Sequence, residues 1–191
     1  MKQIGEMIRW GTEQQPFLMG IIVSVLMGMA LTLPISSAAL GVILNLSGIA
    51  AGAATVGCCA QMIGFATASF RENGIGGLLA QGIGTSMLQV PNIVRKPLIW
   101  LPTIITSAIL GPISTVVLKM TNNAIGSGMG TAGLVGPIMV YKTMITNTSP
   151  TITILMILVM LIIAPAFLTY FISEAMRRKG LIKDGDMKLE I

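Results

Sequence analysis

Long apolar stretches, separated by short polar or glycine-rich connections, make up most of this 191-residue chain. Residues 17–33, 98–118 and 151–172 are each long enough to cross the hydrocarbon core of a bilayer as a helix. Residues 36–70 are apolar for longer than one crossing needs, so we expect a short lead-in piece followed by a closely packed helix over residues 49–70. The pattern predicts an all-α integral membrane protein with about four full transmembrane helices.

Two glycine-rich stretches interrupt this pattern, and they match each other. Residues 82–91 read GIGTSMLQVP and residues 128–137 read GMGTAGLVGP, so both follow G-x-G-T-[SA]-x-L-x-x-P. Glycines and polar residues at membrane depth are tolerated where the backbone is buried in protein or lines a cavity. We therefore expect two broken, re-entrant segments, whose backbone and hinge positions are Gly82, Gly84, Pro91, Gly128, Gly130 and Pro137.

The crossing at residues 98–118 lies between the matching segments. If each segment dips into the bilayer and returns, this single crossing places them on opposite faces. The result would be an inverted repeat that meets near the midplane, where many transporters build their substrate site. The alternative is a coincidental likeness between two glycine-rich segments that only pack helices together.

Composition supports a membrane location. Only 10% of the residues are charged and the mean hydropathy is +0.85, whereas soluble domains have about 25% charged residues. The net charge of +5 comes from residues at the chain ends and in short connections rather than from one patch, so we expect a lipid bilayer and no nucleic acid as partner.

The charged residues suggest three regions. We expect residues 1–15 to form an interfacial helix, residues 16–173 to form the transmembrane domain, and residues 174–191 to be a soluble, basic cytoplasmic tail. With four crossings and two re-entrant segments, both termini would lie in the cytoplasm. Only Lys119 and Lys142 among the twelve Lys and Arg residues would then lie outside, as the positive-inside rule favours.

Several kinds of chemistry are not expected of this chain. Histidine is absent, and the two cysteines, Cys58 and Cys59, are adjacent within an apolar run. Neighbouring cysteines would close a strained ring and have no second pair for a metal site, so we interpret them as small packing residues. No P-loop, nucleophile elbow or zinc-protease motif is present. We expect no metal, no cofactor and no catalytic residue here.

Uncharged amides and hydroxyls near the glycine-rich segments are the candidates for binding a solute. Such groups suit a neutral polyol such as a sugar, because they offer both hydrogen-bond donors and acceptors. The alternative is that they bond between helices and stabilise the bundle. Glu72 is the one acidic residue between positions 16 and 173, and it could equally belong to a solvated turn. The candidate set is Glu72, Gln81, Thr85, Ser86, Gln89, Asn92, Asn122, Asn123, Ser127 and Thr131.

Four stretches carry a resemblance to a known family. GCCAQMIGFA, RENGIGGLLAQGIGTSMLQVPNIV, LPTIITSAILGPISTVVLKM and NNAIGSGMGTAGLVGP resemble bacterial phosphotransferase-system (PTS) enzyme IIC-like membrane proteins, a family that includes regulators of toxin expression. The likeness covers about residues 14–172 and corresponds to the C-terminal half of the usual family chain. The acidic signature with a histidine found in well-studied sugar-binding IIC families is missing, so the resemblance assigns no catalytic residue.

The resemblance implies a sugar permease subunit of the bacterial inner membrane. Its partners would be cytoplasmic IIB and IIA proteins, a second membrane chain or N-terminal half, and a second copy in a homodimer. IIB would phosphorylate the solute as it is delivered, so this chain is at most the translocating subunit of a phosphotransferase. A membrane sensor of gene expression and a channel are the alternatives.

Overall fold

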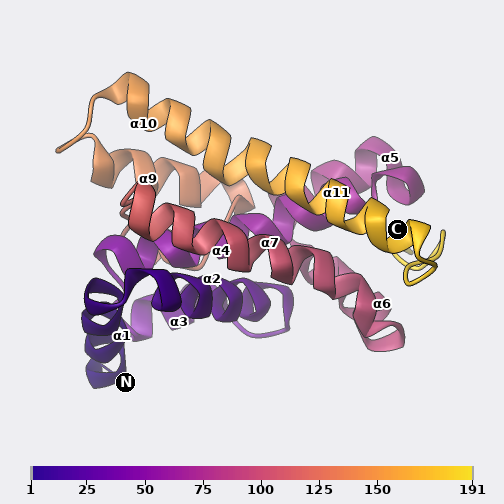
Figure 1. Ribbon diagram of the computed structural model, residues 1–191, viewed down its shortest axis with the longest axis horizontal. Helices are drawn as coiled ribbons and strands as arrows, with labels where there is room; N and C mark the ends of the chain where they lie inside the picture. Colours follow the sequence, from indigo (N-terminus) through magenta and orange to yellow (C-terminus); the bar gives the residue numbers. More distant parts are fainter. Residues whose placement is uncertain (1, 191) are drawn as a thin grey trace.

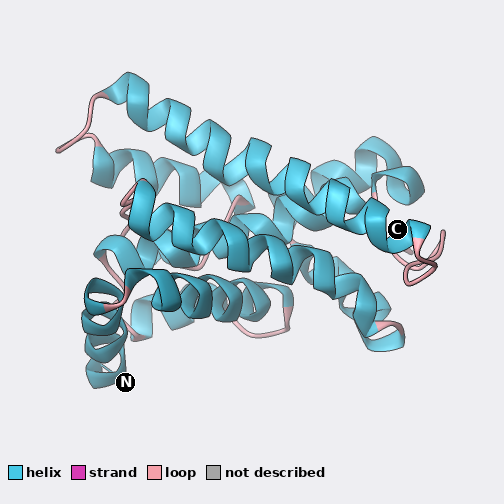
Figure 2. Cartoon of the chain, viewed as in Figure 1, coloured by secondary structure: helices cyan, strands magenta, loops and turns pink. Residues whose placement is uncertain are grey.

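The computed structural model describes residues 2–190, and over this range the chain is helical with no strand (Figures 1 and 2). The α-helices are α1 (Lys2–Gln14), α2 (Pro16–Thr32), α3 (Ser37–Ile43), α4 (Gly48–Ala68), α5 (Phe70–Leu79), α6 (Val90–Arg95), α7 (Leu101–Pro112), α8 (Ala124–Ser127), α9 (Val135–Met144), α10 (Pro150–Ile157) and α11 (Ala164–Arg178). Short 3₁₀ or π turns connect or extend them: η1 (Ala80–Gly84), η2 (Ser86–Gln89), η3 (Pro97–Trp100), η4 (Ile113–Val117), η5 (Ala132–Leu134) and η6 (Leu158–Ile163).

Three continuous helices are long and apolar enough to cross a membrane. They are Gly48–Ala68, Pro97–Val117 and Pro150–Arg178, and Pro16–Thr32 forms a shorter apolar helix. The four predicted crossings therefore correspond to four helices of the structure, and the predicted all-α membrane fold is confirmed.

Helix α4 is the centre of the bundle. In the most apolar stretch of α4, 89% of the residues are buried, against 22% in that of the helix that runs from α10 through α11. The small residues of α4 permit this burial because they let neighbouring backbones approach closely. Gly57 lies against the backbone carbonyl of Ser24 in α2, and Gly52 lies against that of Met120.

Substitution of Gly57 tests this close packing. Gly57→Ala is expected to lower the free energy of unfolding by about 1–3 kcal/mol, because the added methyl group would overlap the carbonyl of Ser24. The matched control is Gly76→Ala, where an added methyl group meets no atom within 4 Å. Thermal unfolding in detergent measures both variants, and equal stability of the two would contradict the described α2–α4 contact.

The helices α2 and α4 run parallel to each other. Ser24 lies beside Gly57, and further along both helices Thr32 hydrogen-bonds Gln61 at 3.2 Å. Helix α3 and its linkers therefore return the chain from the end of α2 to the start of α4. Leu44, just after α3, lies against Gly5 of α1. Helix α7 runs antiparallel to α4, whereas α11 runs parallel to α4.

As a consequence, the two ends of the chain lie at opposite ends of the bundle (Figure 1). Arg9 of α1 donates a hydrogen bond to Ser47 at the start of α4, whereas Arg177 of α11 donates one to the carbonyl of Ala68 at its end. This differs from the expectation that both termini share one face. The reason is α3, whose return adds one passage that the apolar pattern does not reveal.

Candidate functional site

The first glycine-rich segment approaches the middle of α4 from its C-terminal end. The chain turns at Ser69 into α5, and Gln81 of η1 donates a hydrogen bond back to the Ser69 hydroxyl at 2.8 Å. Gly82 then lies beside Ala66, and Ser86 in η2 pairs with the hydroxyl of Thr32 at 2.9 Å. After η2, helix α6 leads away from the middle of the bundle.

The second glycine-rich segment approaches from the N-terminal end of α4. The amide of Asn122 donates to the carbonyl of Gly48 at 3.2 Å, and α8 then brings Ser127 close to Cys58. Beyond the turn, Thr143 in α9 donates a hydrogen bond to the carbonyl of Thr121 at 2.9 Å, so the chain has returned to the level at which it started.

The tips of the two segments touch. The hydroxyl of Thr131 donates a hydrogen bond to the carbonyl of Gly82 at 2.6 Å and lies 3.5 Å from the sulfur of Met62. The local structure also repeats, because in each copy a break at the threonine, Thr85 or Thr131, is followed by a 3₁₀ turn and then an α-helix. Gly130 adopts φ +53° against the backbone of Cys58, a conformation and a spacing that favour glycine.

A pocket of about 160 Å³ lies between the two tips. Its polar side chains are Ser36, Ser37 and Thr85, and none of its lining residues is charged. The volume is below the about 300–1,000 Å³ of typical ligand sites, so this conformation has room for only part of a sugar-sized molecule. The pocket is lined by Leu31, Ile35, Ser36, Ser37, Ala38, Met62, Gly84, Thr85, Met87, Gly128, Met129 and Ala132.

Only Thr85, Gly84 and Gly128 of the predicted site and hinge residues line this pocket, and Thr131 joins the tips beside it. Ser86 pairs with Thr32 of α2, and the other polar candidates form two separate networks, one at each end of the bundle. Whether any of them contacts a solute stays a prediction.

The network near the start of α4 bonds to that helix and within the second glycine-rich segment and its lead-in. Asn122 donates to the hydroxyl of Thr55 at 2.7 Å, and Asn123 accepts a bond from the amide of Gly126 at 2.9 Å. Ser127 donates to the carbonyl of Ala124. These bonds support the alternative that such polar groups stabilise the fold.

The network beyond the end of α4 contains the remaining candidates. Gln89 donates to the side-chain oxygen of Gln81, and Asn92 donates to that of Gln89, each at 2.9 Å. Both amides also bond to the backbone of the C-terminal segment. Pro91 and Pro137 begin the outgoing parts of the two copies, and Gly82 supplies the carbonyl at the contact between them.

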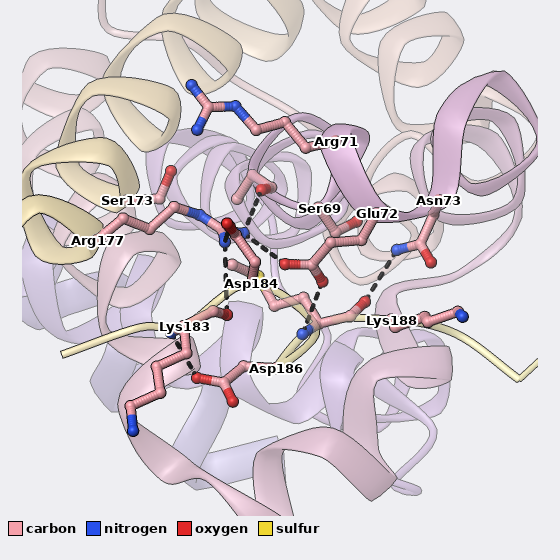
Figure 3. Close-up of polar contacts among 12 residues, drawn as sticks. Ser69, Arg71, Glu72, Asn73, Ser173, Arg177, Lys183, Asp184, Asp186 and Lys188 are labelled. Carbon is pink, nitrogen blue, oxygen red and sulfur yellow. Dashed lines mark hydrogen bonds and ion pairs between the residues drawn. The ribbon is translucent and has the colours of Figure 1, made fainter. Parts of the chain in front are cut away.

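Glu72 belongs to the same end of the bundle and is not a solvated turn residue. Its carboxylate accepts a bond from the guanidinium of Arg177 at 2.8 Å, and the two side chains are 6% and 8% exposed. The second oxygen of the carboxylate accepts a bond from the amide of Met187 at 2.8 Å (Figure 3).

Sequence reasoning missed one buried polar centre around Gln61 in α4. Its side-chain oxygen accepts bonds from Trp100 and Thr103, each at 2.8 Å, and from Thr32. Its side-chain nitrogen has no hydrogen-bond partner within residues 2–190, although the side chain is buried. The available signal was that Gln61 is the one carboxamide in the apolar run of α4.

Among the described residues no group of three His, Cys, Asp or Glu side chains could hold a metal ion. The polar groups at and around the two tips are backbone groups, hydroxyls and amides, which donate and accept hydrogen bonds.

Comparison with known protein families identifies the chain. The family model described as "Phosphotransferase system, EIIC" matches residues 1–189. The chain belongs to the PTS EIIC family. Membership supports a membrane location, a PTS permease-type role and a partnership with IIB proteins, and it confirms the resemblance seen in the sequence. No curated protein and no solved structure matches the chain.

Proposed function

We propose that this EIIC protein translocates a neutral polar solute, a sugar or a polyol, across the bacterial inner membrane for phosphorylation by a separate IIB protein. The observation that carries the proposal is the contact between the two glycine-rich tips, Thr131 to Gly82, beside a pocket in the middle of the bundle. Two broken segments that approach from opposite ends of a helix and meet at a pocket are an arrangement used by many transporters.

The chemistry of the pocket favours a neutral solute. Hydroxyls such as those of Ser36, Ser37 and Thr85 both donate and accept hydrogen bonds, which matches the hydroxyl groups of a polyol. A charged solute would lose its hydration in this pocket without meeting an opposite charge.

The charge distribution supports one orientation in the membrane. Eight of the twelve Lys and Arg residues lie at the end of the bundle where α4 terminates, so the positive-inside rule places this end in the cytoplasm. Helix α1, with Lys2 and Arg9, then lies at the opposite face. The eight are Arg71, Arg95, Lys96, Arg177, Arg178, Lys179, Lys183 and Lys188.

In this proposal the two tips are re-entrant and alternate between open and closed arrangements. The Thr131 hydroxyl, which donates to the carbonyl of Gly82, holds the tips together in the closed arrangement around the bound solute. Movement of the first segment then opens the pocket toward the cytoplasm, where IIB acts.

Solute binding and uptake test the proposal. A thermal-shift screen of the purified protein against sugars, polyols and anions is expected to reveal stabilisation by a neutral polyol, about 2.7 kcal/mol at a ligand concentration 100 times Kd. Counterflow of the labelled hit in proteoliposomes is expected to saturate with concentration. Stabilisation by anions alone would contradict the neutral-solute proposal, and non-saturating flux would indicate a channel.

A further inference from the structure

The segment that follows α11 folds back over the cytoplasmic end of the first glycine-rich segment. It was expected to be a soluble tail, yet Met187 is 0% exposed, Ile182 2% and Leu189 7%. The side chains of Ile182 and Met187 pack with Phe65 of α4 and with neighbouring apolar residues. The segment is therefore a docked part of the structure.

Five hydrogen bonds join the backbone of residues 187–189 to side chains of α5, η2 and α6. The amide of Met187 donates to Glu72, and the amide of Leu189 donates to the side-chain oxygen of Asn73 at 2.7 Å. The carbonyl of Met187 accepts bonds from Asn73 at 2.8 Å and Gln89 at 3.0 Å, and that of Lys188 accepts one from Asn92 at 2.9 Å.

Two of the bonding side-chain amides lie at the end of the first glycine-rich segment or directly after it. Gln89 lies in η2 and Asn92 in α6, and Gln89 is linked through Gln81 to the part of the chain that forms the tip. A shift of this segment toward or away from α4 would therefore change its bonds with the docked C-terminal segment.

Ion pairs and glycines define how the segment is attached. Arg177 bonds Asp184 at 2.8 Å (Figure 3). Lys96 bonds Asp186 at 3.0 Å. Partial burial alone would raise the pKa of Asp186, but the backbone amide of Lys183 and the ammonium of Lys96 lower it overall. Gly180 and Gly185 have φ of +72° and +96° with no neighbouring atom within 4 Å, so they provide turns at which the segment can pivot.

The docked segment also borders a pocket that adjoins the pocket between the two tips, which we call the central pocket. Met87 lines the pocket between the tips and a second pocket of about 340 Å³ nearer the cytoplasm. On one side the second pocket is bounded by Leu88, Pro91 and Asn92 of the first segment, and on the other by Lys188, Leu189 and Glu190. The two pockets are thus neighbours across Met87, and the C-terminal segment forms one wall of the second pocket.

We propose that residues 183–190 are a latch on the cytoplasmic side of this permease, and that their release opens a route from the central pocket past Met87. The inference rests on the proposed function, because the route matters only if a solute leaves by it. The latch holds the first segment through backbone bonds to Gln89 and Asn92, so latch release and movement of that segment are coupled.

Access to the central pocket tests the latch without any solute. A single reporter, Thr85→Cys, is placed in a Cys58→Ala/Cys59→Ala background and labelled with a water-soluble thiol reagent from the cytoplasmic side. Truncation after Ile182 is expected to raise the labelling rate at least about tenfold, because loss of a docked segment exposes what it covers. Equal rates with and without residues 183–191 would overturn the latch.

A full-length variant keeps this test valid if the truncated chain does not fold. Lys96→Glu places a carboxylate opposite Asp186 in place of the ammonium. Like the truncation, it is expected to raise the labelling rate of Thr85→Cys. The matched control is Lys142→Glu at the opposite end of the bundle, where labelling is expected to stay unchanged. A Lys96→Glu rate equal to that of the control would also overturn the proposal.

A reversible tether connects the latch to transport. Arg95→Cys/Glu190→Cys, at an exposed ion pair of 3.4 Å, is cross-linked with a bifunctional methanethiosulfonate and later reduced. Uptake is expected to stop on cross-linking and return on reduction, whereas Arg71→Cys/Glu174→Cys, which ties α5 to α11, leaves uptake intact. Undiminished uptake with the tether in place would contradict the latch.

The labelling and uptake results together distinguish the latch from the permease function. Faster labelling of truncated protein that moves no solute would support the latch and contradict the proposed permease function.

Discussion

Replacing Arg177 with alanine is expected to lower the free energy of unfolding by about 3–5 kcal/mol, because removing one partner of a buried ion pair leaves the other charge uncompensated. Glu72 would keep its bond from the amide of Met187 but lose the guanidinium at 2.8 Å. Arg177 also donates to the carbonyl of Ala68 and to Asp184, so its loss separates α11 from α4 and from the C-terminal segment. Both effects act in the same direction.

The neighbouring Arg178 provides the matched control. Its side chain is 80% exposed and lies 3.9 Å from Glu174 within the same helix, so Arg178→Ala is expected to change stability by about 0–1 kcal/mol. Thermal or chemical unfolding of both variants in detergent gives the comparison. If Arg177→Ala were as stable as Arg178→Ala, the Glu72–Arg177 pair would not be the buried link between α11 and α5.

Removing the hydroxyl of Thr131 is expected to have the largest effect on solute binding. Thr131→Val is similar in volume but leaves the carbonyl of Gly82 without its donor, a cost of about 1–3 kcal/mol for a buried group. This corresponds to about a tenfold to hundredfold loss of affinity if the solute binds where the tips meet. Thr85→Val, at the equivalent position of the first copy, is expected to weaken binding as well, since Thr85 lines the pocket.

Two further threonine variants separate binding from folding. Thr131→Ser keeps the hydroxyl and is expected to bind nearly as well as the wild type. Thr146→Val removes a hydroxyl from an exposed turn and is expected to change nothing. Titration of the solute found in the screen measures all four proteins. Wild-type affinity in both Thr131→Val and Thr85→Val would contradict the placement of the site at the tips.

The length of each apolar run predicts the long helices well. Residues 49–70 correspond to Gly48–Ala68, and residues 98–118 correspond to Pro97–Val117, because the bilayer sets the minimum length of a crossing helix. The passage through α3 was not predictable in this way. Ser37–Ile43 is far too short to cross alone, and its role depends on tertiary contacts such as Ser37 to the carbonyl of Gly128 at 2.6 Å.

The candidate site was only partly accessible to sequence reasoning. Recurrence of the G-x-G-T pattern identified the two segments that touch, because their glycines permit close backbone approach. Polarity alone could not separate Thr85, which lines the pocket, from Asn122, which bonds Thr55. The partners of Gln89 and Asn92 are backbone atoms of the C-terminal segment, and backbone groups leave no sequence signal.

The central claim is that the two glycine-rich segments enter the membrane from opposite faces and each returns to its own face. Four single cysteines test it, two flanking the first segment (Arg71→Cys, Arg95→Cys) and two flanking the second (Lys119→Cys, Lys142→Cys), each in a Cys58→Ala/Cys59→Ala background. Labelling with a membrane-impermeant thiol reagent in oriented vesicles is predicted to reach the first pair only from the cytoplasmic face and the second pair only from the other face. Labelling of the two cysteines of either pair from different faces would show that the segment between them crosses the membrane, and would contradict the account.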